Sequence, residues 1–200
     1  MKKLSKKENQ KLFDAYDHFR TYFEKWLLKS IDVCFDATSK EGNGTPLSAY
    51  ILLSCAIDTL AGFYTGRDRS YSRKRGKRVK GKAPVNVGRQ NLLFIRAYMK
   101  AYPAAKLQRG VRNYLVHNFT LRQDILLTHN SHDNHMTDVR IPAGKKNRAR
   151  NCLLINFEDL LADFKAAYEQ YLVDLDTSAD LQRKFMRRFR RFGFIGPKDI

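Results

Sequence analysis

The residues of this chain best suited to chemistry are an arginine and a histidine five positions apart. Arg112 and His117 lie in the segment RNYLVHNF, which begins two residues beyond Gly110. An imidazole moves protons near neutral pH, and a guanidinium holds a phosphate through two parallel hydrogen bonds. Together the two groups are sufficient to cut RNA without a metal ion. The spacing alone is weakly specific in an arginine-rich chain, so the surroundings must supply the specificity.

Asp58 is the second informative residue, because it is the only charged residue in the apolar segment LSAYILLSCAIDTLAGFY. An ionised carboxylate inside an apolar helix must be paired or hydrogen-bonded, since its desolvation costs several kcal/mol. The candidate partners on other predicted core helices are Arg96, Arg112 and His117, and we favour Arg112 or His117. A purely structural ion pair is the alternative interpretation.

A regular helix would not bring Arg112 and His117 together, because five residues rotate the chain to leave them about 140° apart. Their convergence on one phosphate requires a distorted or terminal turn, or a site at a subunit contact of a twofold dimer. Gly110 is unfavourable inside a helix and indicates close packing or a boundary at this point.

The net charge of +18 and the isoelectric point near 10.0 indicate a partner with many negative charges. Nucleic acid is the first inference and an anionic membrane surface the second. Three clusters account for all of this charge, and solubilising surface segments are the alternative explanation. We expect RNA to contact the first cluster, which consists of Arg67, Arg69, Arg73, Lys74, Arg75, Lys77, Arg78, Lys80 and Lys82. We also expect contacts from part of the cluster at 183–191, namely Arg187, Arg188, Arg190 and Arg191. The third cluster is Lys145, Lys146, Arg148 and Arg150.

Apolar residues recur at spacings of three and four through most of the chain, which predicts helices. The expected helices cover about 8–37, 47–65, 89–99, 104–119, 157–175 and 179–192, with Asn156 and Ser178 as N-caps of the last two. A basic loop is expected at 66–88. Residues 125–127 and 136–141 favour a small hairpin, to which 151–156 could add a third strand.

Other features exclude several classes of site. No secretory signal is visible, and no stretch approaches the length of apolar residues needed to span a bilayer, so we expect a cytoplasmic protein with no membrane partner. Cys34, Cys55 and Cys152 are far apart and predict free thiols, not a metal site. Zinc binding by His129, His132 and His135 remains an alternative to solvated turn histidines. Near the C-terminus, Phe185, Phe189, Phe192 and Phe194 either stack on bases or pack on the domain.

The segment LQRGVRNYLVHNF, preceded by CAIDTLAGFYTGR, resembles the HEPN superfamily of higher eukaryote and prokaryote nucleotide-binding domains. The family motif is an arginine, a polar residue that is often asparagine, about three further residues and a histidine. Arg112, Asn113 and His117 match it, and Asp58 matches an acidic residue that family members often carry on an earlier core helix. Many members are metal-independent endoribonucleases that act as dimers, often as toxins or antiviral effectors, whereas others are non-catalytic partners.

We therefore predict one mainly α domain over residues 1–200. A HEPN-like helical bundle would cover about 8–119 and 156–192, with the basic loop at 66–88 and a β-hairpin insertion at about 124–156 after the motif helix. The resemblance implies an RNA endonuclease of the toxin or phage-defence type that needs no cofactor or metal and acts as a homodimer. The alternative is a non-catalytic nucleic-acid-binding module, or a partner protein such as an antitoxin.

The resemblance also implies roles for four residues in a transesterification. His117 would act as general base towards the ribose 2′-hydroxyl or as general acid towards the leaving 5′-oxygen. Arg112 would stabilise the charge that grows on the phosphoryl oxygens. Asn113 would orient either group or bind the phosphate, and Asp58 would hold Arg112 or His117 in place.

Overall fold

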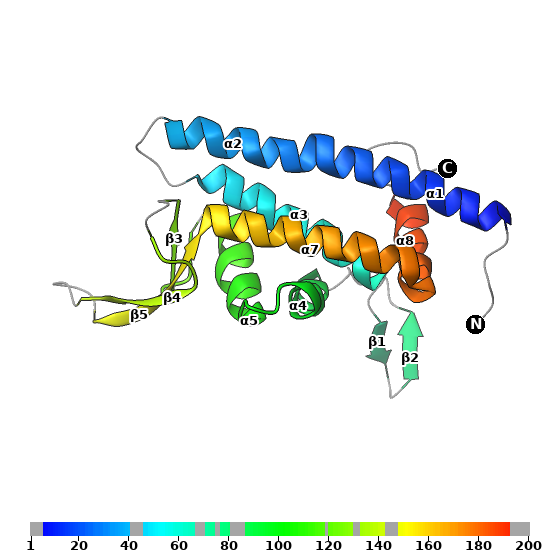
Figure 1. The fold of residues 1–200 in the computed structure, drawn as a ribbon. Coiled ribbons are helices and arrows are strands. Elements are labelled where there is room, and N and C mark those ends of the chain that lie inside the picture. Colours follow the sequence, from blue (N-terminus) through cyan, green and yellow to red (C-terminus); the bar gives the residue numbers. More distant parts are fainter. Residues whose placement is uncertain are drawn as a thin grey trace.

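The structure is a computed structural model that describes residues 6–40, 46–66, 71–74, 77–80, 87–118, 120–129, 133–142 and 148–192. These residues form a mainly helical protein with a small three-stranded sheet at one end, as Figure 1 shows. The mainly α class predicted from the sequence is confirmed. The bundle of long helices lies beside the sheet, and a two-stranded hairpin projects from the opposite end (Figure 1).

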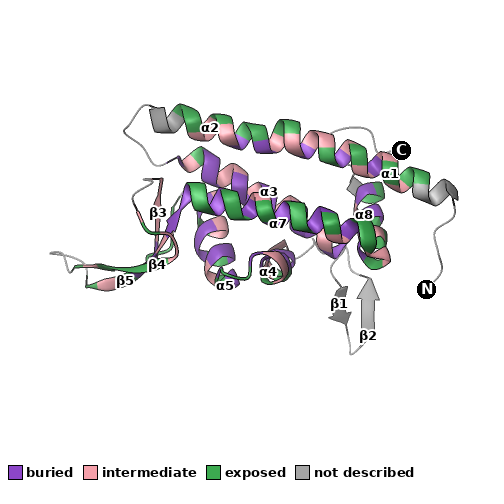
Figure 2. Cartoon of the chain, viewed as in Figure 1, coloured by how far each residue is buried: buried purple, intermediate pink, exposed green. Residues whose placement is uncertain are grey.

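The N-terminal fifth of the chain is one long helical rod. It consists of α1 (Lys6–Tyr22), a π-helical segment η1 (Phe23–Leu28) and α2 (Lys29–Lys40). Ala15, Phe19, Phe23 and Ile31 are fully buried along one side of this rod. Buried and exposed residues alternate along the rod and along α7 in Figure 2, as expected for helices that bury one face.

Helix α3 (Leu47–Thr65) is the central helix and has the bounds predicted from its apolar sequence. By length and composition it is long and apolar enough to cross a membrane, so the expectation that no segment reaches that length was wrong. In the fold, however, 56% of its apolar window is buried inside the protein. Its apolar character is therefore explained by contacts with the surrounding helices.

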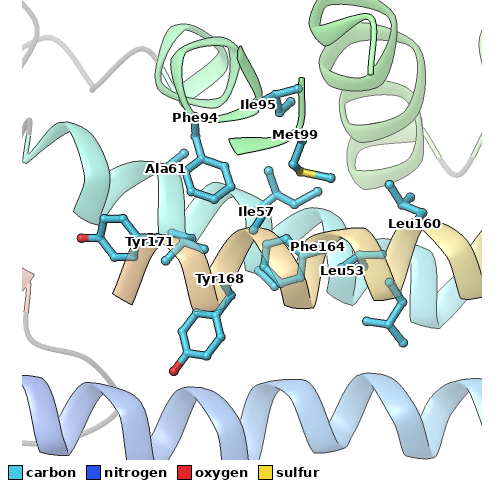
Figure 3. Close-up of a cluster of buried hydrophobic side chains, with 14 of the residues drawn as sticks. Leu53, Ile57, Ala61, Phe94, Ile95, Met99, Leu160, Phe164, Tyr168 and Tyr171 are labelled. Atoms are coloured by element: carbon cyan, nitrogen blue, oxygen red, sulfur yellow. The ribbon is translucent and has the colours of Figure 1, made fainter. Parts of the chain in front are cut away.

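The core lies where α3 meets α4 (Val87–Tyr98) and α7 (Phe157–Thr177). Figure 3 shows the apolar side chains that converge there, which are Leu53, Ile57, Ala61, Phe94, Ile95, Met99, Leu160, Phe164, Tyr168 and Tyr171. The predicted cap of α7 is present, because the Asn156 side chain accepts a hydrogen bond of 2.9 Å from the Glu158 amide. This cap fixes the point at which the chain leaves the sheet and enters the bundle.

The last helix, α8 (Ala179–Phe192), crosses the end of the bundle. Its predicted cap is also present, since the Leu181 amide donates to Ser178 Oγ over 3.3 Å. Phe185 and Phe189 are buried in the core, so these two aromatics pack on the domain instead of offering surfaces to bases. The Phe192 side chain and Phe194 lie outside the described residues.

A glycine at the end of α3 allows α8 to pack closely against it. Gly66 ends α3 in the left-handed conformation, with φ of 58°, and a Cβ built on it would lie 2.6 Å from the Lys184 backbone. Only glycine combines this backbone angle with so close an approach. The end of the central helix is thereby held against α8.

The sheet differs from the predicted insertion. It contains β3 (Ile125–Thr128), β4 (Thr137–Ile141) and β5 (Arg150–Asn156), in the order β3-β5-β4. The expected hairpin between β3 and β4 was wrong, because β5 lies between them, parallel to β3 and antiparallel to β4. The physical reason is burial: Cys152, Leu153 and Ile155 make β5 the apolar strand, whereas β4 is polar and largely exposed and belongs at an edge.

The basic segment at 66–88 was predicted as a loop, and this too was wrong in part. It contains β1 (Tyr71–Lys74) and β2 (Lys77–Lys80), which pair antiparallel with Arg73 opposite Arg78. The two strands are separated in the sequence by two residues, of which the second is Gly76, and this spacing is typical of a hairpin. The many basic residues of the segment favoured the interpretation as a loop instead.

A chain of hydrogen bonds around His135 connects the sheet to the bundle. The Asn156 amide donates to His135 Nδ1 over 3.0 Å, so the ring must carry its proton on Nε2, 2.8 Å from the Tyr102 hydroxyl. Tyr102 in turn donates to Asp163 on α7 over 2.7 Å. Burial lowers the pKa of His135 below its ordinary value, although the nearby carboxylates of Asp159 and Asp163 oppose this shift.

This pKa shift predicts a loss of stability in acid. Because the folded state takes up the proton less readily than the unfolded state, the contribution is complete above about pH 6.5, the ordinary histidine value, and declines as the pH falls. Between pH 7 and pH 5 the urea midpoint of the wild-type protein should therefore fall more than that of His135→Gln. The His129→Gln variant serves as the control for loss of a histidine. Equal falls in all three proteins would contradict the prediction.

Candidate functional site

The segment predicted to carry the chemistry is a helix with an irregular centre. It runs as α5 (Ala104–Lys106), a π-helical stretch η2 (Leu107–Asn113) and α6 (Tyr114–Asn118). In a π-helix each backbone hydrogen bond joins residues five apart instead of four. The predicted helix is thus present but contains a distorted turn.

This distortion accompanies the convergence of the two predicted residues. Arg112 is the penultimate residue of η2, and its Nη1 lies 3.0 Å from Nε2 of His117 in α6. A regular α-helix would have pointed the two side chains in different directions. Of the two arrangements that the sequence allowed, the distorted turn is the one that this chain contains, and the contact needs no second subunit.

Asp58 holds the other edge of the same guanidinium. Arg112 Nε and Nη2 both donate to Asp58 Oδ2, over 2.8 Å and 2.5 Å. Each side chain is 17% exposed, so the pair is largely removed from water. The predicted pairing of Asp58 with Arg112 is confirmed, whereas Arg96 is exposed. The catalytic roles of these residues stay predictions.

Asn91 on α4 completes the support of Asp58 and was missed by the sequence analysis. Its Nδ2 donates a short hydrogen bond to Asp58 Oδ1, so both carboxylate oxygens accept from the protein. Asn91 is 1% exposed, and its own Oδ1 is buried without a hydrogen-bond partner among the described residues. The available signal was positional: Asn91 precedes Phe94 and Ile95 at helical spacing and so lies on the buried face of its helix.

Asn113 contacts the guanidinium from a third direction. Its Oδ1 accepts from Arg112 Nη1 over 3.1 Å and from Gln108 Nε2 over 3.1 Å. A guanidinium has five N–H donors, and the contacts with Asp58, Asn113 and His117 engage four of them. Arg112 is therefore fixed in orientation by its neighbours before any ligand binds.

The contact with Arg112 also defines the state of His117. A guanidinium can only donate, so Nε2 of His117 must accept, and the ring is neutral with its proton on Nδ1. This is the form of histidine that can act as a base.

The cluster extends from the core to the surface. Asn91 is buried, Asp58 and Arg112 are partly buried, and His117 is exposed to solvent. A small, mainly apolar pocket lies beneath the guanidinium, lined by Leu53, Ser54, Ile57, Asn91, Ile95, Leu107, Gln108, Val111, Arg112 and Leu160. The arrangement places the His117 imidazole at the surface, in contact with a guanidinium that is itself largely removed from water.

Gly110 allows the sheet to approach this helix. A Cβ built on Gly110 would lie 2.2 Å from Ile125 Cδ1 of β3, far closer than side chains pack. The Gly110 carbonyl also accepts a hydrogen bond of 3.3 Å from the Arg122 amide. The close packing inferred from this glycine is therefore confirmed, and β3 packs directly on the irregular turn.

The predicted nucleic-acid-binding residues separate into three groups. Arg187, Arg190 and Arg191 are exposed on one face of α8, whereas Arg188 packs with its guanidinium against Gly62 of α3. The backbone positions of Arg73, Lys74, Lys77, Arg78 and Lys80 lie on β1 and β2. The remaining four, Arg67, Arg69, Arg75 and Lys82, lie outside the described residues.

In the part of the chain that the structure describes, no group of three or more His, Cys, Asp or Glu side chains is arranged so that it could hold a metal ion. Both ring nitrogens of His135 are hydrogen-bonded, and His132 lies outside the described ranges. Cys34, Cys55 and Cys152 are free thiols, as predicted. Burial raises the pKa of the Cys55 thiol, and the nearby Asp58 carboxylate adds to this effect.

Comparisons with known protein families, with curated proteins and with solved structures yield no match to this chain. The resemblance to the HEPN superfamily therefore stays a prediction from the sequence.

The burial of the ion pair predicts strong coupling between its members. Asp58→Ala and Arg112→Ala should each lower the free energy of unfolding by about 2–3 kcal/mol, because each leaves a largely buried charge unpaired. The double variant should lose less than the sum of the two, with a coupling of about 1–3 kcal/mol measured by urea denaturation.

The matched control is the pair of Asp32 and Lys165, whose side chains are 46% and 41% exposed. Its coupling should stay below about 1 kcal/mol, because exposed ion pairs contribute little. A coupling between Asp58 and Arg112 no larger than this control would show that the pair does not organise the site.

Proposed function

We propose that this protein is a metal-independent endoribonuclease that cleaves RNA by transesterification through the ribose 2′-hydroxyl. The observation that carries the proposal is a single guanidinium that contacts both a partly buried carboxylate and an exposed, neutral imidazole. The resemblance of Arg112, Asn113 and His117 to the HEPN motif supports the same reaction, as does the strongly basic composition.

The chemistry follows from the positions of the two groups. Nε2 of His117 removes the proton of a 2′-hydroxyl, and the resulting oxygen attacks the adjacent phosphorus. The bond from phosphorus to the 5′-oxygen breaks, which leaves a 2′,3′-cyclic phosphate on one fragment and a 5′-hydroxyl on the other. The leaving oxygen takes its proton from solvent or from an acid such as His117 of a second copy in a homodimer.

Substrate binding must rearrange the contact between Arg112 and His117. Nη1 donates to His117 Nε2, so this contact has to open before Nε2 can accept a proton, and a phosphate oxygen can take the place of His117 as acceptor. This exchange places the guanidinium on the phosphoryl group, where negative charge grows in the transition state, and frees the base at the same moment. Asp58 retains the opposite edge of the guanidinium throughout, which keeps Arg112 directed towards the surface.

Charge placement supports a polyanionic substrate. The register of the β1–β2 hairpin sets Arg73 opposite Arg78 and Lys74 opposite Lys77. Paired basic positions give this hairpin a high density of positive charge, which a polyanion such as RNA would neutralise. We place the enzyme in the cytoplasm, as a toxin-like or phage-defence effector.

The second candidate is a non-catalytic nucleic-acid-binding module or a partner protein of the antitoxin kind. It is favoured by the exposed arginines of α8, which belong to a different element from His117. In this case the Asp58–Arg112 network would be purely structural.

The first test is cleavage of RNA in the presence of a chelator. Wild-type protein should produce fragments that end in 2′,3′-cyclic phosphate and 5′-hydroxyl groups, identified by end-specific labelling. His117→Ala should lower the rate by about 10²–10⁴-fold, since it removes the general base. Arg112→Lys should lower it by about 10²–10³-fold, because a lysine keeps the charge but loses the paired donors.

Two variants control for the loss of a histidine and of an arginine. His129→Ala and Arg109→Lys change residues of the same types outside the cluster and should keep wild-type rates. Thermal melting should show that all four variants are folded. Cleavage that persists in His117→Ala would defeat the ribonuclease proposal, and no cleavage by any of the proteins would favour the second candidate.

The salt dependence of RNA binding tests the basic face of α8. Replacing Arg187, Arg190 and Arg191 together by Gln should weaken binding and reduce the slope of log affinity against log salt by about 2–3, roughly 0.7–0.9 for each lost phosphate contact. The control replaces the exposed Lys11, Lys25 and Lys29, which removes the same charge from the N-terminal rod. Equal changes in slope for the two triple variants would rule out a specific role for α8.

A further inference from the structure

Tyr114 is a large aromatic side chain left partly exposed beside the cluster. It is 39% exposed, although its neighbours Val111 and Leu115 are almost completely buried. These two buried residues fix the backbone of the helix on the core, and the Tyr114 carbonyl accepts a hydrogen bond of 3.3 Å from the Thr120 amide. The ring is therefore presented to solvent from a rigid backbone.

The position of Tyr114 relates it to the reacting groups. It is the first residue of α6 and precedes His117 by three residues, so the two Cβ atoms are roughly 5–6 Å apart on one face of the helix. It also follows Arg112 and Asn113 directly in the chain. A phosphate held by Arg112 and approached by His117 would bring the base of an adjoining nucleotide within reach of this ring.

We propose that Tyr114 is the stacking surface for a nucleobase next to the scissile phosphate, an inference that rests on the proposed ribonuclease function. Aromatic side chains stack on any base, because every base has a π-face, and such contacts tolerate different sequences. A tyrosine loses little conformational entropy when it is ordered in this way. The ligand of this subsite is an unpaired nucleobase.

The proposal names the substrate class more narrowly than the basic clusters do. Bases in an A-form duplex are stacked on their neighbours, and only those in single strands, loops or ends can be splayed onto a side chain. The enzyme should therefore act at unpaired positions, with phosphate contacts supplying affinity and Tyr114 selecting for an accessible base.

The test measures binding, so that it does not depend on cleavage. In a His117→Ala background, a fluorescently labelled 12-nucleotide single-stranded RNA is compared with an oligomer of the same length in which every base is removed. Tyr114→Ala should weaken binding of the intact RNA by about tenfold and leave binding of the abasic oligomer unchanged. Tyr114→Phe should bind as the parent does, because the ring is retained.

Two further controls separate stacking from other effects. Trp26→Ala removes another exposed aromatic, on the N-terminal rod, and should not change binding of either oligomer. Tyr114→Leu keeps an apolar side chain without a π-face and should lose affinity as Tyr114→Ala does. If Tyr114→Ala has a lowered melting temperature, Tyr114→Leu is used in its place. A fully paired RNA duplex should bind the parent and Tyr114→Ala equally well.

The outcomes distinguish the two proposals. Equal loss of affinity for the intact and abasic oligomers, or no loss for either, overturns the stacking inference even where wild-type protein cleaves RNA. Selective loss for the intact oligomer supports the inference even where no cleavage is found, and then only the ribonuclease proposal fails. A protein that binds neither oligomer overturns the inference as well.

Discussion

The ion pair between Asp58 and Arg112 is the constraint on which the candidate site depends. A carboxylate placed on the central helix of the bundle cannot stay ionised without partners, because its desolvation is costly. Arg112, 54 residues later, supplies two donors, and Asn91 supplies a third. The same contacts that satisfy Asp58 therefore orient the guanidinium, so stabilisation of the core and positioning of the cation are a single arrangement.

The irregular turn of the motif helix is the second requirement. Backbone hydrogen bonds in a π-helix are less common than those of an α-helix, and such turns persist where surrounding contacts support them. Here Gly110 admits Ile125 of β3 against the turn, while Val111 and Leu115 pack into the core. The sheet thus packs against the helix that carries Arg112 and His117 and supports its irregular turn. This arrangement gives the small insertion between α6 and α7 a structural purpose at the site, apart from any contact with a ligand.

Local patterns in the sequence predicted much of this structure, whereas contacts between segments far apart in the sequence could not be predicted from it. The bounds of α3, the caps at Asn156 and Ser178 and the pairing of Asp58 follow from hydrophobic periodicity, capping chemistry and the cost of a buried charge. The parallel pairing of β3 with β5 joins strands separated by the whole of β4, which no short-range pattern encodes. A π-helical turn shifts hydrogen bonds by one residue without a change in composition. Asn91 resembled an ordinary polar residue until α4 was placed against α3.

The order of the elements along the chain has a consequence for the newly synthesised protein. Asp58 and Arg112 emerge from the ribosome early, but Leu160 on α7 lines the pocket beneath the guanidinium, and the α7 side chains Phe164 and Tyr168 complete the core around α3. A nascent polypeptide therefore lacks one wall of this pocket until Phe157–Thr177 has been translated and packed. The core around the Asp58–Arg112 pair is therefore complete only late in synthesis.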